Sequence, residues 1–120
     1  MEVPRRGAGF VEPSSTNDGK PGSITIGRLV LSFDRFQCLV DDRRVALTYD
    51  EFEILGFLCT HPNRIVSYDV LASWLWDLTG RTANRRLNVT MHRIRAKLGD
   101  ITPYEIRTVR ERGYGLVLNG

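Results

Sequence analysis

Several features that would mark an enzyme, a secreted protein or a membrane protein are missing from this sequence. The longest apolar runs, such as Ile54 to Cys59, are far too short to span a bilayer, and MEVPRRGAG at the start breaks up any signal-peptide core. No Ser/His/Asp or Cys/His arrangement, paired-carboxylate motif, glycine-rich phosphate loop or metal-ligand spacing is present. The sequence therefore predicts no catalytic activity, no metal and no cofactor.

Cysteine and histidine are also scarce. Cys38 and Cys59 are the two cysteines of the 120 residues, and both stand among hydrophobic neighbours. We expect them to be reduced, buried and structural, as in a cytoplasmic protein. His61 and His92 lack a motif partner, and His61 is expected simply to end a helix.

Acidic residues are absent from Leu78 to Gly99, a stretch that holds six lysines and arginines. The net charge is only +3, but it is unevenly distributed: residues 24–77 carry five basic and eight acidic groups, whereas residues 78–120 carry nine and three. Such a dipolar distribution orients a domain on a polyanion. Chance asymmetry in a short chain remains the alternative.

The segment Asn84 to Leu98 is predicted to form an amphipathic helix. Its apolar stripe follows helical spacing and consists of Leu87, Met91, Ile94 and Leu98. The opposite side would present Arg85, Val89, His92, Arg93 and Ala96, with Arg86, Thr90 and Lys97 along one edge. A basic face with small residues at its centre favours close approach to a nucleic-acid groove, whereas the alternative is an ordinary solvated helix face, usually mixed in charge sign.

The remaining elements follow from periodicity and capping signals. Residues 1–23 are rich in proline and glycine and are predicted to be a disordered tail or linker, leaving 24–120 as one domain. Alternating apolar residues from Ile24 to Leu47, with turns at Asp34-Arg35 and Asp41-Asp42, predict a small antiparallel sheet with one buried face.

Two further helices and a hairpin complete the predicted order. Thr48 and Glu51 form a capping box for a helix that ends near Thr60, with Tyr49, Phe52, Leu55, Gly56 and Cys59 on one face. A short strand at 65–66 precedes a second helix, capped by Ser67 and running over 68–76, whose apolar face is Val70, Leu71, Trp74 and Leu75. A polar loop over 77–83, with a turn at Thr79-Gly80, leads to the basic helix, which Gly99 ends. A hairpin is then predicted over 105–117, with a mostly basic tip at 110–113. Such a tip suits contact with a phosphate backbone or minor groove, and the alternative is that it only increases solubility.

This order is that of a winged helix-turn-helix, an α+β fold. The stretches LTYDEFEILGFLCTHPNRIVS, LNVTMHRIRAKL and IRTVRERGYGL resemble the OmpR/PhoB family of bacterial response-regulator effector domains over about residues 24–117. The resemblance implies an N-terminal four-stranded sheet, three helices and a C-terminal β-hairpin wing. It also implies that the third helix, about 83–98, enters the major groove while the wing, about 105–117, meets the backbone or minor groove.

The resemblance assigns site residues position by position. Arg93 matches the arginine that reaches bases or phosphates, while Thr108 and Arg110 match wing residues that contact phosphate and the minor groove. The other expected DNA-binding positions are Arg85, Arg86, Val89, Thr90, His92 and Lys97. Arg95, nearer the apolar stripe, either contacts DNA or pairs with an acidic residue of the domain. This sequence departs from the family pattern at three positions: Glu111 replaces the usual glycine, Asn88 an aspartate and Thr90 a histidine.

These observations predict a sequence-specific duplex-DNA-binding regulator in the bacterial cytoplasm, at the nucleoid, without membrane association. The resemblance further implies a homodimer on tandem half-sites and a loop over 76–84 available to RNA polymerase. No receiver domain is evident, so the chain is either a fragment of a longer regulator or an effector with another input. The alternative function is a winged-helix protein-interaction module that docks on RNA polymerase or another regulator without reading DNA.

Overall fold

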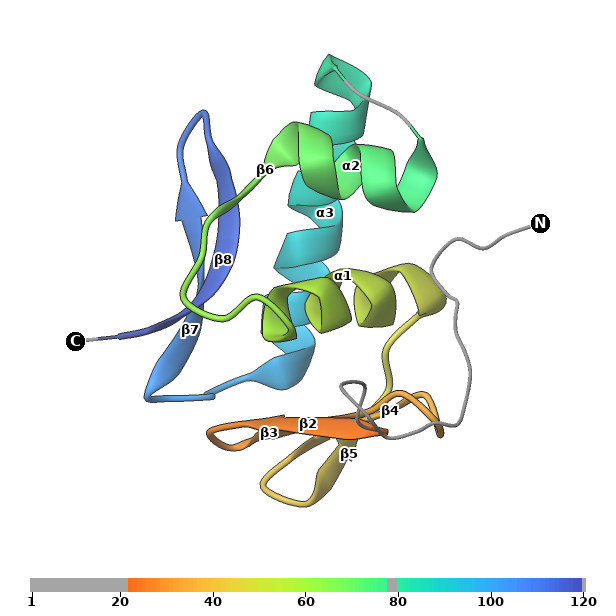
Figure 1. Cartoon of the computed structure of the whole chain (residues 1–120), viewed down its shortest axis with the longest axis vertical. Coiled ribbons are helices and arrows are strands. Elements are labelled where there is room, and N and C mark those ends of the chain that lie inside the picture. The colour runs from red at the N-terminus through yellow and green to blue at the C-terminus, as the bar shows by residue number, and fades with distance from the viewer. Residues whose placement is uncertain (1–21, 78–79, 120) are drawn as a thin grey trace.

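The computed structural model of this protein describes residues 22–77 and 80–119 and arranges them as two antiparallel sheets and three helices (Figure 1). The first sheet pairs its four strands in chain order: β2 (Ser23–Ile26), β3 (Leu29–Ser32), β4 (Gln37–Val40) and β5 (Arg43–Val45). Leu29, Leu31, Cys38, Val40 and Val45 alternate along the strands and are buried. The predicted sheet with one buried face is confirmed.

The edges of the predicted segments differ slightly from those observed. Residues 1–21 of the tail predicted over 1–23 lie outside the described residues, and Ser23 already begins β2. The Asp41-Asp42 turn is confirmed, because both residues adopt the left-handed conformation that aspartate tolerates, with φ of 53° and 67°. At the other turn it is Phe36 that takes a positive φ, 55°, and its ring packs 4.1 Å from that of Phe52.

The helices begin where the capping signals predict, with one exception. The predicted capping box of Thr48 and Glu51 starts α1 (Tyr49–Cys59), and the Ser67 hydroxyl accepts from the Val70 amide at the start of α2 (Tyr68–Trp76). The third helix, α3 (Arg81–Leu98), starts earlier than predicted, directly after Gly80. The connection between α2 and α3 is therefore shorter than the predicted loop, and its residues 78–79 lie outside the described residues.

Two residues that were placed on apolar helix faces turn out to be exposed. Tyr49 is 55% exposed and stacks on the ring of Phe36, and Val70 is 49% exposed. Both lie in the first turn of their helix. The rest of the α1 face is buried as predicted, whereas on α2 Leu71 is buried and Trp74 and Leu75 are half-buried.

The second sheet forms the wing and attaches it to the helices. It pairs β6 (Val66–Ser67) with β8 (Gly113–Leu118), and β8 with β7 (Tyr104–Val109), all antiparallel. Glycine is required in β8 because a Cβ on Gly113 would lie 1.9 Å from the carbonyl oxygen of Val66. We use "wing" for the β7–β8 hairpin, which stands beside α3 in Figure 1.

The core lies where the three helices and both sheets meet. The predicted stripe of α3 is its centre: Leu87, Met91, Ile94 and Leu98 are each at most 1% exposed. Cys38 and Cys59 are buried and free, and burial raises the pKa of the Cys38 thiol to about 11. Within the described ranges, no helix is both long and apolar enough to cross a membrane.

Candidate nucleic-acid interface

The face of α3 opposite the core is open to solvent. Arg85, Val89, His92 and Arg93 are exposed, with Val89 at 45%, as the helical periodicity predicts. Neither Arg85 nor Arg93 has a carboxylate partner within the described part of the chain. Because the apolar stripe of α3 is fixed in the core, these side chains all lie on one surface. They are available there to an anionic ligand.

Arg86 lies on the edge of this face and is already engaged. Its guanidinium stacks on the ring of Trp76, 4.3 Å from the ring centroid, and its Nη2 lies 3.5 Å from Oδ2 of Asp50. The indole Nε1 of Trp76 donates to the same oxygen over 3.1 Å. One residue from each helix thus joins a single cluster, in which half of the Arg86 side chain stays exposed.

Thr90 and Lys97, the other predicted edge residues, each have a partner within the domain. Thr90 is 9% exposed, and its hydroxyl donates to the carbonyl oxygen of Arg86 over 2.9 Å. The ammonium of Lys97 lies 2.7 Å from Oε1 of Glu51, whose side chain is 3% exposed. The helical wheel placed both along one edge of the basic face, but it could not show that α1 packs on α3.

Glu51 combines its capping role with this ion pair. Burial by itself raises the pKa of its carboxyl, but the hydrogen bonds from Lys97 and from the Thr48 amide outweigh burial and leave the pKa below its ordinary value. The carboxylate is therefore charged at neutral pH. It ties the start of α1 to the last turn of α3, which keeps the exposed face of α3 in a fixed orientation.

The wing is attached to α3 through Arg95. Its Nε and Nη2 donate to the carbonyl oxygen of Ile106 over 3.1 and 2.9 Å, and Nη2 also donates to the Thr108 hydroxyl over 2.5 Å. Pairing of Arg95 with an acidic residue is therefore wrong: the partners in β7 are a carbonyl and a hydroxyl. Thr108 is exposed but shares its oxygen with Arg95.

The wing tip carries the predicted cations. Arg110 and Arg112 are exposed there. Glu111, which stands where the family pattern has glycine, adopts a left-handed conformation with φ of 63°. This conformation is less favourable for glutamate than for glycine.

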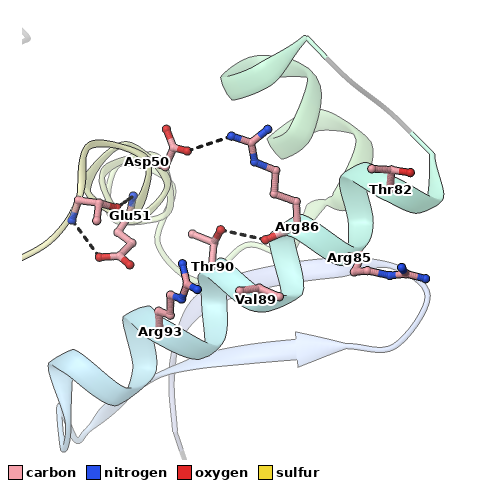
Figure 2. A pocket seen from close by; sticks show the side chains of 9 residues that line it. Asp50, Glu51, Thr82, Arg85, Arg86, Val89, Thr90 and Arg93 are labelled. Atoms are coloured by element: carbon pink, nitrogen blue, oxygen red, sulfur yellow. Dashed lines mark hydrogen bonds and ion pairs between the residues drawn. The ribbon is translucent and has the colours of Figure 1, made fainter.

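An open groove runs between the first turn of α1 and the exposed side of α3 (Figure 2). Its lining consists of Thr48, Asp50 and Glu51 on one side and of Thr82, Arg85, Arg86, Val89, Thr90 and Arg93 on the other. Sequence reasoning missed this placement of Asp50 and Glu51. The sequence identified both only as favourable residues at the start of a helix, and the packing of α1 on α3 brings them to the basic face.

A family model described as "Transcriptional regulatory protein, C terminal" matches residues 42–116, more than half of the chain. The chain belongs to this family. The match confirms the resemblance to OmpR/PhoB-type effector domains and their winged-helix fold. This family is one of transcription regulators and not a class of enzymes.

Individual relatives agree with this membership. The chain is 33% identical over 108 residues to the alkaline phosphatase synthesis transcriptional regulatory protein PhoP of Bacillus subtilis, covering 87% of this chain and 45% of that protein. It is 38% identical over 114 residues to the two-component response regulator PhoP of Pseudomonas aeruginosa, covering 92% and 45%. The chain thus spans less than half the length of these relatives. The solved DNA-binding domain of Klebsiella pneumoniae RstA, in complex with the RstA box, superposes with a TM-score of 0.70 at 32% identity, covering 79% of this chain and 96% of that one.

Proposed function

We propose that this chain is the sequence-specific, duplex-DNA-binding part of a transcription regulator, with α3 in the major groove and the wing at the backbone or minor groove. The observation that carries the proposal is the two-sidedness of α3: four apolar residues are fixed in the core while Arg85, Val89 and Arg93 face solvent together. The similarity to an RstA domain solved on its DNA box supports it. The proposal includes no catalytic activity.

Each exposed residue has a chemical role on this surface. Arg93 presents two N–H donors suited to O6 and N7 of a guanine, and Val89 suits the methyl group of a thymine. Arg85 and His92 flank them, and Arg86 and Thr90 line the groove beside α1, where one DNA strand would pass. Lys97 and Thr108 reach the surface as well, but each already has a partner in the domain: Lys97 pairs with Glu51, and the Thr108 hydroxyl accepts from Arg95.

Selection of bound duplexes from a random pool, followed by fluorescence anisotropy on the enriched sequence, tests this function. We expect affinity on the order of 10⁻⁸ M or tighter at physiological salt. Arg93→Ala should weaken binding by about 1–3 kcal/mol, roughly 5- to 150-fold, and relax the preference at one base position. Arg44→Ala is the matched control, because Arg44 is exposed on β5 of the other sheet.

Two results would reject the proposal. One is an Arg93→Ala variant that binds every duplex as well as the parent. The other is the absence of both an enriched sequence and a salt dependence, which would instead favour a module that docks on proteins.

The proposal extends to partners on the basis of the family resemblance. The chain would bind tandem half-sites as a homodimer in the bacterial cytoplasm, at the nucleoid, and the segment 76–84 would be available to RNA polymerase. Titration of duplexes that carry one or two copies of the selected site tests the dimer, since cooperative binding requires both copies.

A further inference from the structure

The acidic residue on the rim of the basic groove needs an explanation, because a carboxylate beside DNA opposes binding. Asp50 is 37% exposed at the side chain and lies on the groove between α1 and α3, opposite three arginines. Phosphates that pass this groove would be repelled by it. An isolated surface aspartate here would simply weaken DNA binding.

Asp50 is not isolated, however, but is held in place from two directions. It lies in the first turn of α1, where the positive end of the helix favours a carboxylate. The Trp76 indole donates to its Oδ2 over 3.1 Å, so α2 fixes the position of that oxygen. Asp50 is therefore held in a defined position on the groove.

Arg86 is restrained by two residues, Trp76 and Asp50. Its guanidinium lies over the Trp76 ring, and the carboxylate draws Nη2 toward α1. Figure 2 shows Arg86 reaching from α3 toward Asp50, while Arg85 extends away from it. Within the described residues Nε and Nη1 of Arg86 have no partner, so these N–H groups remain available to a ligand. An arginine that is already restrained loses less conformational entropy when it binds a ligand, so the entropic cost of binding is smaller.

We propose that Asp50 is a specificity-determining residue, which positions Arg86 against Trp76 for the cognate duplex and repels duplexes that bind by charge alone. The inference rests on the proposed DNA-binding function. Non-cognate binding depends on phosphate neutralisation, so the charge of Asp50 weakens it fully. On the cognate duplex the same charge also orients Arg86, which offsets the repulsion.

Asp50→Asn tests the proposal, since it removes the charge and keeps an oxygen for the Trp76 N–H. We expect binding to a scrambled duplex to tighten several-fold and binding to the selected duplex to tighten less or to weaken. The ratio of the two dissociation constants should therefore fall by about threefold or more. Asp42→Asn is the matched control: Asp42 is exposed in the β4–β5 turn, and asparagine tolerates its positive φ of 67°.

The same substitution in an Arg86→Ala background separates positioning from charge. There, Asp50→Asn should tighten both duplexes by the same factor and leave the discrimination ratio unchanged. An equal tightening of both duplexes in the parent background, or the same change of ratio without Arg86, would overturn the proposal. If the parent protein shows no preference for any duplex, the underlying function fails instead, and that outcome is visible before any variant is measured.

Discussion

At the scale of single residues, the buried carboxylate of Glu51 ties folding stability to pH. Its pKa is lowered in the fold relative to 4.5, so its contribution to stability is present above about pH 4.5 and is lost as the pH falls through the lowered value. Lys97→Met would leave this carboxylate buried without its cation. We expect the free energy of unfolding to drop by about 2–4 kcal/mol at pH 7, the lower values reflecting the partial exposure of Lys97.

Urea unfolding monitored by circular dichroism at pH 7 and near pH 3.5 measures this effect. The deficit of Lys97→Met should shrink at the lower pH, because Glu51 is then protonated in the variant and no longer needs a cation. Arg44→Met removes an exposed cation from β5 and should show little deficit at either pH. An equal deficit of Lys97→Met at both values would show that its aliphatic packing matters, not its charge.

The positions of some site residues depend only on their own helix, whereas those of others depend on contacts with distant parts of the chain. Arg85, Val89 and Arg93 could be placed from helical periodicity alone, because they lie opposite the buried stripe. The ion pair of Lys97 could not, since its partner Glu51 lies on α1, 46 residues earlier in the chain. The position of Asp50 beside Arg86 and Trp76 also depends on how α1, α2 and α3 pack together, so it could not be predicted from the sequence.

At the scale of elements, local signals set most boundaries. Thr48, Ser67 and Gly99 mark three helix ends through side-chain caps or a positive φ, and all three were predictable. The start of α3 was not, because Gly80 makes no side-chain capping bond and gives no such signal. The attachment of the wing to α3 was equally hidden, since Arg95 bonds to a backbone carbonyl, and any residue could supply one.

Arg95 makes a testable connection between two elements. Arg95→Ala removes the bonds to the Ile106 carbonyl and the Thr108 hydroxyl, which should cost about 1–2 kcal/mol of stability for these partly exposed contacts. Amide hydrogen exchange in β7 should accelerate, while exchange in the first sheet should not change. Arg107→Ala is the control, because Arg107 pairs with Glu105 on the same strand. Unchanged exchange in β7 would mean that the β7–β8 pairing alone fixes the wing.

At the scale of the whole molecule, the fold gathers the basic C-terminal third of the chain on one surface. The basic residues of the C-terminal third come from α3 and the wing, which stand side by side in Figure 1. The 18-residue α3 is about 27 Å long, and the wing lies beside it. The acidic middle segment is placed mostly on the first sheet and α1, so a duplex has one favourable approach.

This arrangement assigns the wing a different role from that of α3. Arg110 stands at the exposed tip with no carboxylate partner among the described residues, so it is free to meet a phosphate. Arg110→Ala should weaken selected and scrambled duplexes by similar factors and lower the slope of log affinity against log salt by about 0.9, one phosphate contact. Arg35→Ala removes an exposed arginine from the turn between β3 and β4 and should leave the slope unchanged. If Arg110→Ala keeps the parent's slope, the wing does not touch the backbone and α3 alone carries the interface; if it changes a single base preference instead, the wing reads the minor groove.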